Sequence, residues 1–327
     1  MQNSYITFMI IAILTFSITA FLEAKLIPIL KKKAAQPIYL EGPGWHQSKH
    51  GTPTMGGLAF LIAIMASLAL GAMILFIYGK DNSSLSLLLC ALYALSNALI
   101  GLIDDLSKIR HKQNKGLSPM EKLLMQSLAA VLFLVARSFL LSGTEILKFG
   151  FGEVDLGAFY YPIAFIMLLA TVNSANLTDG IDGLASSVAF AISIALMYIS
   201  KDQGEEAFLI SSAIIGATTA FLIFNLHPAR IFMGDTGSLL LGALISASAI
   251  TLGNPLIIIF LGGVYLIEAL SVIIQVVFFK LTGKRVFKMA PIHHHLEQCG
   301  LTENTICIIA ILATLILSIP AVMLYLS

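Results

Sequence analysis

The stretch LAFLIAIMASLALGAMILFIY, residues 58–78, contains no charged side chain. A helix of about 20 apolar residues is long enough to cross the hydrocarbon layer of a membrane. Similar runs recur along the chain, and only 11% of its 327 residues are charged, whereas soluble domains have about a quarter. We therefore expect an all-α polytopic membrane protein in which residues 1–327 form a single integral membrane domain.

The apolar runs predict ten transmembrane helices. Their expected bounds are 5–30, 54–78, 85–103, 121–142, 158–174, 184–200, 207–225, 236–252, 255–280 and 305–326. The first run lacks a basic leader and a cleavage site, so we expect it to be retained as a span. In the ninth span, Gly262 and Gly263 indicate either a break or simply close packing. Between the fourth and fifth spans, EILKFGFGEVDLG favours a small extracytoplasmic β-hairpin and an irregular loop equally.

Lysine and arginine are distributed unevenly between the predicted loops. Only Lys80, Arg137, Lys148 and Lys201 fall on one side, and nearly all the others fall on the opposite side. The positive-inside rule then predicts that the basic side is cytoplasmic and that both termini are extracytoplasmic. The net charge of +1 gives no basis for nucleic-acid binding. The three cysteines form no CxxC pair, which argues against redox chemistry.

Five aspartates lie at the predicted cytoplasmic ends of helices. In NALIGLIDDLSKIRHKQNKG, residues 97–116, Asp104 and Asp105 precede a basic run. Carboxylates that can hold a hard cation therefore stand beside ammonium groups that can hold phosphate. A solvated helix end with topology-setting lysines is the alternative. The basic candidates for phosphate binding are Lys108, Lys112 and Lys115.

Two further stretches carry polar residues at helix junctions. In TVNSANLTDGIDGLA, residues 171–185, Asn173, Asn176, Asp179 and Asp182 recur every third residue, which predicts a shared side of one turn or helix. In FNLHPARIFMGDTGSLLLG, residues 224–242, Asp235 lies in a Gly-rich turn that opens a span, where helix amino termini attract anions. Capping of helix ends is the alternative for both stretches.

Three consecutive histidines, His293, His294 and His295, lie in MAPIHHHLEQCG, residues 289–300. Neighbouring side chains diverge by about 100° on a helix and about 180° on a strand, so three in a row are poorly arranged to chelate one ion. Two interpretations of the triplet remain: the histidines contact phosphate or sugar oxygens of a substrate, or they lie in a solvated loop. The segment WHQSKHGTPTMGG, residues 45–57, adds Lys49 before a Gly-rich turn.

Taken together, KHGTPTMGG, LIDDLSK, NLTDGIDGLA, FNLHPARIFMGDTGS and APIHHHLE resemble the motifs of the phospho-N-acetylmuramoyl-pentapeptide transferases, in family order and across nearly the whole chain. Ile181, where many members have leucine, leaves the polar pattern intact. The resemblance implies a homodimeric bacterial inner-membrane enzyme of peptidoglycan synthesis. Such an enzyme uses Mg²⁺ to move phospho-MurNAc-pentapeptide from UDP-MurNAc-pentapeptide to undecaprenyl phosphate, giving lipid I and UMP.

The resemblance also implies roles for individual residues. Asp235 is expected to bind Mg²⁺ with Asp104 or Asp105 nearby, and one of this pair orients or deprotonates the lipid phosphate. The histidine triplet is expected to position substrate in the active site. The positions associated with the nucleotide, and with the nucleoside inhibitors of the family, are Lys49, Asn173, Asn176, Leu177, Asp179, Asp182, Asn225 and Phe232.

Two other functions remain as alternatives. A sister enzyme would transfer N-acetylglucosamine 1-phosphate to a polyprenyl phosphate. A transporter would place ionisable residues deep within its spans, where only Glu23, Lys25, Arg137 and Glu268 are candidates.

Overall fold

A computed structural model of the chain describes residues 2–33, 49, 51–111, 116–141, 146–149, 152–201 and 203–326. Within these ranges the protein is a bundle of helices with one small β-hairpin. The α-helices are α1 (Gln2–Lys33), α2 (Gly57–Ile77), α3 (Asp81–His111), α4 (Pro119–Leu140), α5 (Tyr160–Thr178), α6 (Leu184–Ser200), α7 (Glu205–Asn225), α8 (Gly234–Thr251), α9 (Ile258–Leu261), α10 (Gly263–Thr282), α11 (Ile292–Gln298) and α12 (Glu303–Leu326). Short 3-10 helices, η2 (Gly157–Phe159) and η3 (Pro255–Ile257), precede α5 and α9.

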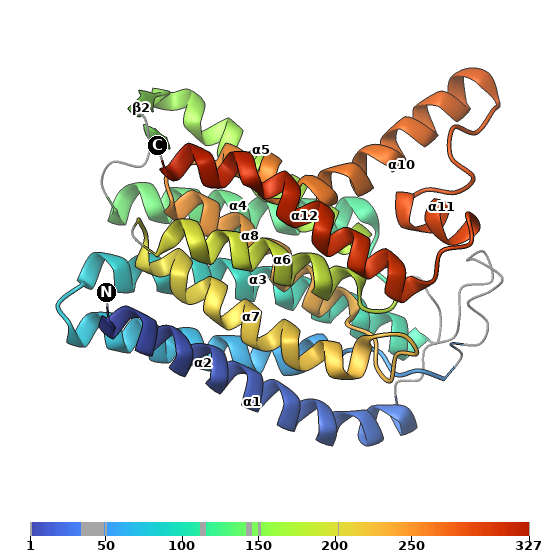
Figure 1. Cartoon of the computed structure of the whole chain (residues 1–327), viewed down its shortest axis with the longest axis horizontal. Helices are drawn as coiled ribbons and strands as arrows, with labels where there is room; N and C mark the ends of the chain where they lie inside the picture. The colour runs from blue at the N-terminus through green and yellow to red at the C-terminus, as the bar shows by residue number, and fades with distance from the viewer. Residues whose placement is uncertain are drawn as a thin grey trace.

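The expected all-α membrane architecture is confirmed. Eight described helices, α1, α2, α3, α4, α5, α7, α10 and α12, are long and apolar enough to cross a membrane, and α6 is a shorter apolar helix. The ten predicted runs each coincide with a helix or helix pair, but the count of ten membrane crossings stays a prediction. Figure 1 shows the long helices side by side, with both chain ends at one end of the bundle.

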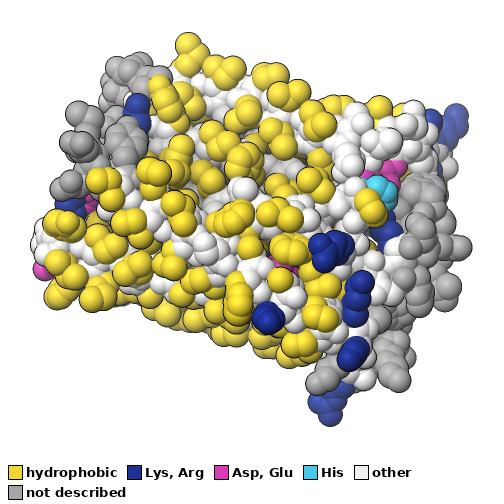
Figure 2. Space-filling view, turned by 60° about the horizontal axis from the view of Figure 1, so that its bottom comes forward, with side chains coloured by type: hydrophobic (Ala, Val, Ile, Leu, Met, Phe, Trp, Pro, Cys, Tyr) yellow, Lys and Arg dark blue, Asp and Glu magenta, His cyan; other side chains and the backbone are white. Residues whose placement is uncertain are grey.

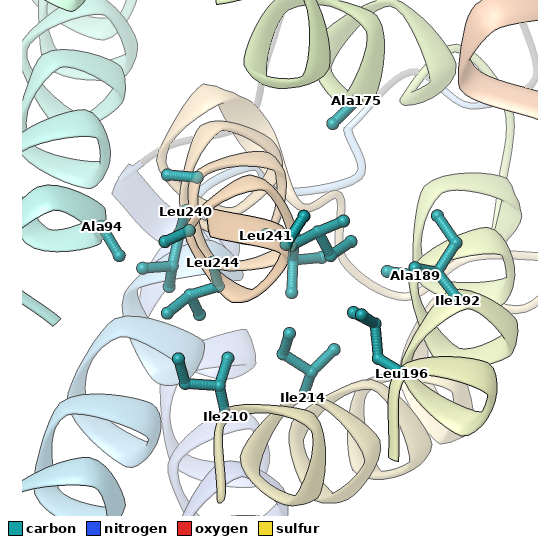
Figure 3. Packing of buried hydrophobic residues seen from close by; sticks show 14 of the residues in the cluster. Ala94, Ala175, Ala189, Ile192, Leu196, Ile210, Ile214, Leu240, Leu241 and Leu244 are labelled. Carbon is teal, nitrogen blue, oxygen red and sulfur yellow. The ribbon is translucent and has the colours of Figure 1, made fainter. Parts of the chain in front are cut away.

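Helix α8 forms the centre of the bundle. It packs against α2, α3, α5, α6 and α7, and every residue from Thr236 to Ile250 is buried. Figure 3 shows Leu240, Leu241 and Leu244 of α8 surrounded by side chains of the neighbouring helices. The many Gly, Ala and Ser residues of α8 let the neighbouring backbones approach closely, as is typical of helix contacts within membranes. Its amino terminus therefore has a fixed position at one end of the bundle.

The ninth predicted span is broken at Gly262. Of the two interpretations of its paired glycines, a helix break and simple close packing, the break is the one found. Helix α9 ends at Leu261, and α10 begins at Gly263. Figure 1 shows α10 running obliquely away from the other helices toward α11. Most apolar side chains of α10 are exposed, including Ile267, Leu270 and Ile273. Because that surface is apolar, we expect it to lie in lipid.

The β-hairpin predicted between the fourth and fifth spans is confirmed. Strands β1 (Ile146–Phe149) and β2 (Gly152–Asp155) pair antiparallel, with Lys148 opposite Glu153. The hairpin lies at the end of the bundle that carries both chain termini (Figure 1). The opposite end, where α3, α5 and α7 finish and α4, α6 and α8 begin, is called the motif end below. Figure 2 shows an apolar flank with lysine and arginine gathered mainly toward one end.

Several glycines allow backbones to meet at the motif end. A Cβ atom on Gly101 of α3 would lie 2.3 Å from the backbone oxygen of Asp235, and one on Gly57 of α2 would lie 2.2 Å from the backbone nitrogen of Gly237. Neither backbone can move without displacing a packed helix. Glycine at these positions therefore lets α2 and α3 contact the first turn of α8.

We expect Gly101→Ala to lower the free energy of unfolding by about 1–3 kcal/mol, because overpacking separates α3 from α8. The matched control is Gly71→Ala, within α2. Its new methyl group would meet the flexible end of Leu209 at 3.2 Å, and alanine is the better helix former by about 1 kcal/mol. Thermal unfolding of both variants in the same detergent measures the difference. Equal melting temperatures for the two would contradict this account of the contact.

Candidate active site

The motif end brings together residues from distant parts of the sequence. The segment before α2 runs beside the turn before α8, because Phe232 donates its N–H to the oxygen of Pro53 at 2.8 Å, and Gly56 donates to the oxygen of Phe232 at 2.9 Å. The predicted motifs around Lys49 and Asp235 are therefore joined through backbone contacts. The site is built on helix ends rather than on a separate domain.

Asp105 holds the amino terminus of α8. Its carboxylate accepts hydrogen bonds from the N–H of Asp235 at 3.0 Å, the N–H of Thr236 at 2.9 Å and the hydroxyl of Thr236 at 2.7 Å. The first N–H groups of a helix have no partner within the helix, so a carboxylate from α3 both satisfies them and favours the helix dipole. Asp105 is 2% exposed and its hydrogen bonds all go to α8.

Asp104 and Asp235 share two lysines. The Nζ of Lys108 lies 2.6 Å from Oδ2 of Asp104 and 3.4 Å from Oδ1 of Asp235, while the Nζ of Lys122 lies 3.1 Å from the same oxygen of Asp104 and also contacts Oδ2 of Asp235. The other oxygen of Asp104 accepts the N–H of Leu117 at 2.7 Å. Buried carboxylates need such partners, because isolated charges are costly away from water.

Asp179 and Asn176 border this cluster. Asn176 donates to Oδ1 of Asp235 at 3.1 Å and to the hydroxyl of Ser238 at 2.9 Å. Asp179 follows the last residue of α5, and burial raises its pKa to about 7, with the charges of Asp235 and Asp105 acting in the same direction. This carboxyl group is therefore partly protonated near neutral pH, unlike an exposed aspartate. A cation bound nearby would favour its ionised form.

A second polar cluster surrounds Asp182. The Nζ of Lys49 lies 2.7 Å from both Asp182 and Glu303. Asp182 also contacts Nδ1 of His227 at 2.9 Å, and its own N–H donates to Glu303 at 2.7 Å. These contacts tie the start of α12 to the turn between α5 and α6. Lys49 is thereby held at the motif end.

The three histidines point to different partners. His293 and His294 are buried, and their Nδ1 atoms lie 2.9 Å from Glu268 and 2.7 Å from Glu297. Nδ1 of His295 accepts the N–H of Lys288 at 3.2 Å. The solvated-loop reading is therefore wrong for His293 and His294, because α11 packs against α10 and α12. The divergence expected for consecutive helical residues is confirmed.

The prediction that Asn173, Asn176, Asp179 and Asp182 share one side of a turn or helix is wrong. The helical period ends with α5 at Thr178, so Asp179 and Asp182 lie in the following turn. Asn173 points instead to α4, where it donates to Gln126 at 2.8 Å. Asn176 faces Asp235, while Asp182 belongs to the Lys49 cluster.

The other residues predicted from the sequence to bind the substrate differ in exposure and in hydrogen bonding. Asn225 accepts the N–H of Gly183 at 3.0 Å and donates to the oxygen of Ile231 at 2.9 Å, so both its groups are used in holding turns. Leu177 is exposed and Phe232 is half-buried. Lys112 and Lys115 lie outside the described residues.

The cluster of Asp104, Asp105 and Asp235 has the donor set that Mg²⁺ prefers. One carboxylate oxygen from each residue lies within 4.8 Å of the others, and hard oxygen ligands suit this ion. The two lysines already bring positive charge to Asp104 and Asp235, so a cation adds to a site where positive charge is favoured. A second group, Asp182, His227 and Glu303, meets the same distance limit. It includes a ring nitrogen, whereas the aspartate cluster offers only the oxygen ligands that Mg²⁺ prefers.

Several residues of the site were not singled out from the sequence as site residues. Lys122 and Glu303 each lie in the first turns of a helix and contact residues from elsewhere in the chain. Glu268 was considered only as a residue of a transport pathway. The available signal for Glu268 was its charge within an apolar run, since an ionisable residue inside a span is a candidate functional residue.

Comparisons with known proteins agree with this arrangement. The glycosyl transferase family 4 model matches residues 87–253, and signature 1 of the phospho-N-acetylmuramoyl-pentapeptide transferases matches residues 49–61. These two matches cover Lys49, the aspartate cluster and the turn around Asp182. The signature ends within α2.

Curated relatives named phospho-N-acetylmuramoyl-pentapeptide-transferase are similar over most of the chain. The protein of Halalkalibacterium halodurans is 43% identical over 296 residues, covering 89% of each chain. That of Clostridium botulinum strain Eklund 17B is 43% identical, covering 93% of this chain and 92% of its own. That of Acetivibrio thermocellus is 41% identical, covering 94% and 92%. With these similarities and the aspartate–lysine cluster at the motif end, the chain belongs to the phospho-N-acetylmuramoyl-pentapeptide transferase family.

Proposed function

We propose that this protein transfers phospho-MurNAc-pentapeptide from UDP-MurNAc-pentapeptide to undecaprenyl phosphate, producing lipid I and UMP. The observation that carries the proposal is the cluster of Asp104 and Asp235 with Lys108 and Lys122 at one end of an apolar bundle. A reaction between two phosphate-bearing molecules, one of them a lipid, needs such a site at the membrane surface. The product belongs to peptidoglycan synthesis, and through it to cell wall biogenesis, cell shape and cell division.

The reaction exchanges one phosphate anhydride for another. An oxygen of the lipid phosphate bonds to the phosphorus nearest the sugar, while the bond from that phosphorus to UMP breaks and UMP leaves with the electron pair. Little net driving force is available, so catalysis rests on alignment and on neutralising the phosphates. Lys108 and Lys122 are suited to this task, because both ammonium groups lie at the aspartate cluster and retain exposed fractions of about 20%.

We assign the magnesium ligands to Asp235 and Asp104, with Asp105 as a structural neighbour. The carboxylate of Asp105 already accepts three hydrogen bonds from the first turn of α8. Asp104 and Asp235 instead face the ammonium groups of Lys108 and Lys122. When bound, Mg²⁺ supplies charge neutralisation of phosphate oxygens. Asp104 is also the better candidate to orient or deprotonate the lipid phosphate.

The nucleotide end of the substrate is assigned to the cluster around Asp182. Lys49, 12% exposed, brings a positive charge to Asp182 and Glu303. The half-buried ring of Phe232 is a candidate to stack on uracil. Asn225 supports the two turns that border this region. Nucleoside inhibitors of the family would occupy the same residues.

The lipid chain is assigned to the apolar surface along α10. This helix leaves the bundle at Gly262 and runs obliquely past α11, so a chain lying against it stays in the bilayer while its phosphate reaches the motif end. The excess of lysine and arginine at that end favours a cytoplasmic active site with both termini extracytoplasmic, in the bacterial inner membrane. We also propose a homodimer, as the family resemblance implies.

The two alternatives have less support. The sister reaction with N-acetylglucosamine 1-phosphate is disfavoured by the signature matched at residues 49–61. For a transporter, Arg137 and Glu268 would have to form a pathway. Arg137 instead donates to Ser86 at 3.0 Å, and Glu268 contacts His293.

We expect Asp235→Asn to reduce magnesium-dependent UMP release by about a hundredfold or more, because an interaction with the developing phosphate charge is lost. In a thermal unfolding assay, Mg²⁺ at about 100 times its dissociation constant should stabilise the parent protein by about 2.7 kcal/mol and stabilise this variant much less. Asp81→Asn is the matched control, because Asp81 is an exposed residue in the first turn of α3, at the opposite end of the bundle. Near-normal turnover by Asp235→Asn would remove this residue from the mechanism.

The choice of sugar nucleotide tests the proposed substrate directly. Purified protein with undecaprenyl phosphate and Mg²⁺ should release UMP from UDP-MurNAc-pentapeptide and at most about 1% as fast from UDP-N-acetylglucosamine, because binding energy from the remote peptide is lost with the smaller substrate. Separation of the lipid products by chromatography identifies which sugar phosphate was transferred. Preferential use of UDP-N-acetylglucosamine would assign the protein to the sister reaction.

A further inference from the structure

Glu268 and His293 form a buried hydrogen-bonded pair between two elements near the motif end. Glu268 lies on α10 and His293 on α11, and they are 2% and 1% exposed. Oε2 of Glu268 lies 2.9 Å from Nδ1 of His293. Tyr265, Glu268 and Ser271 form the buried face of α10, while other faces of this helix are apolar and exposed. A polar pair on this face is costly to bury, so it calls for a specific explanation.

The second nitrogen of His293 has no hydrogen-bond partner among the described residues. This atom, Nε2, is fully buried in the protein. Leaving a buried polar atom without a partner is destabilising. By contrast, His294 on the same short helix has a local partner, Glu297, three residues later.

The orphan nitrogen faces the turn that follows α5. A Cβ atom placed on Gly180 would lie 2.2 Å from Nε2 of His293, so only glycine lets this turn pack directly against the ring. Asp179, the preceding residue, donates its N–H to the oxygen of Asn176 at 3.2 Å, and Asn176 donates to Asp235 at 3.1 Å. The ring edge of His293 therefore meets the backbone at the border of the aspartate cluster.

The chemistry of the pair determines which atom of the ring is free. An ionised carboxylate only accepts hydrogen bonds, so a bond to Glu268 requires a proton on Nδ1 of His293. Nε2 is then the ring atom left for another molecule. Fixing one nitrogen in this way sets the tautomer and orientation of a functional histidine.

We propose that Glu268 is a positioning residue for the group transfer, which holds His293 so that Nε2 contacts an oxygen of the bound sugar phosphate. This inference rests on the proposed function and adds to it a role for a residue within a predicted span. Glu268 acts through His293 and does not itself touch the substrate. Because Nε2 is buried against Gly180 in the free protein, the turn at Gly180 must move for the substrate oxygen to reach the ring.

Glu268→Gln tests the role with little change of shape. We expect kcat for UMP release to fall by about 10- to 100-fold, the effect typical of losing a partner that orients a functional histidine. The KM for each substrate should change less than about threefold, because the interaction is used in the transition state rather than in binding alone. Ser271→Ala, one turn further along the same buried face of α10, is the control and should keep the parent kcat.

A double-mutant cycle separates positioning from a general structural role. If Glu268 acts through His293, Glu268→Gln should have no further effect on kcat in a His293→Ala background. Multiplication of the two losses would overturn the proposal, as would a parent-like kcat for Glu268→Gln alone. The activity of the parent protein in the same assay tests the proposed function separately.

A measurement on the parent protein covers the case in which a variant fails to fold. In ¹⁵N-histidine-labelled protein in lipid nanodiscs, the signal assigned through His293→Gln should show a protonated Nδ1. A second variant, Glu268→Asp, should shift that signal while Ser271→Ala leaves it unchanged. An unprotonated Nδ1 in the parent protein would overturn the proposal whatever the activity.

Discussion

The hydrogen bonds from the first turn of α8 to Asp105 are the constraint on which the rest of the site depends. They fix the amino terminus of α8, the most buried helix, to α3. Asp235, in the first turn of α8, therefore faces Asp104 across the two lysines. Gly101 lets the two backbones meet there. A longer side chain at Gly101 or a shorter acceptor at Asp105 would change the distance between the two proposed ligands. The adjacent aspartates thus have different tasks, because one is used in assembly and the other faces the lysines.

The balance of positive and negative charge explains how the buried aspartates of the cluster are stabilised when no substrate is bound. Three aspartates and two lysines leave a small net negative charge, and each ammonium group lies within reach of both Asp104 and Asp235. These lysines stabilise the carboxylates when no other cation is present. Arrival of a cation and phosphates would release them to bind phosphate oxygens. The same residues can therefore serve the stability of the free protein and the neutralisation of the substrate.

Sequence alone predicts much of the fold, because apolar runs in a membrane protein are long and have few competing interpretations. It also identifies the aspartates, since carboxylates at helix ends stand out in a chain with few charges. It does not predict which way each side chain points. The period through Asn173, Asn176, Asp179 and Asp182 failed because α5 ends at Thr178, so the three-residue spacing runs across a helix end and into a turn. Glu303 and Lys122 were missed because their roles arise only when distant helices meet.

The helix break at Gly262 allows α10 to serve both as an apolar surface and as the partner of α11. Without it, α9 and α10 would continue as one helix within the bundle, and Glu268 would have no reason to meet α11. With it, α10 exposes apolar side chains such as Ile267 on one side and presents Glu268 to His293 on another. A lipid substrate has a chain that must remain in the bilayer and a phosphate that must leave it. A helix that is apolar outside, polar inside and oblique to the bundle would suit both the lipid site and the positioning role proposed above.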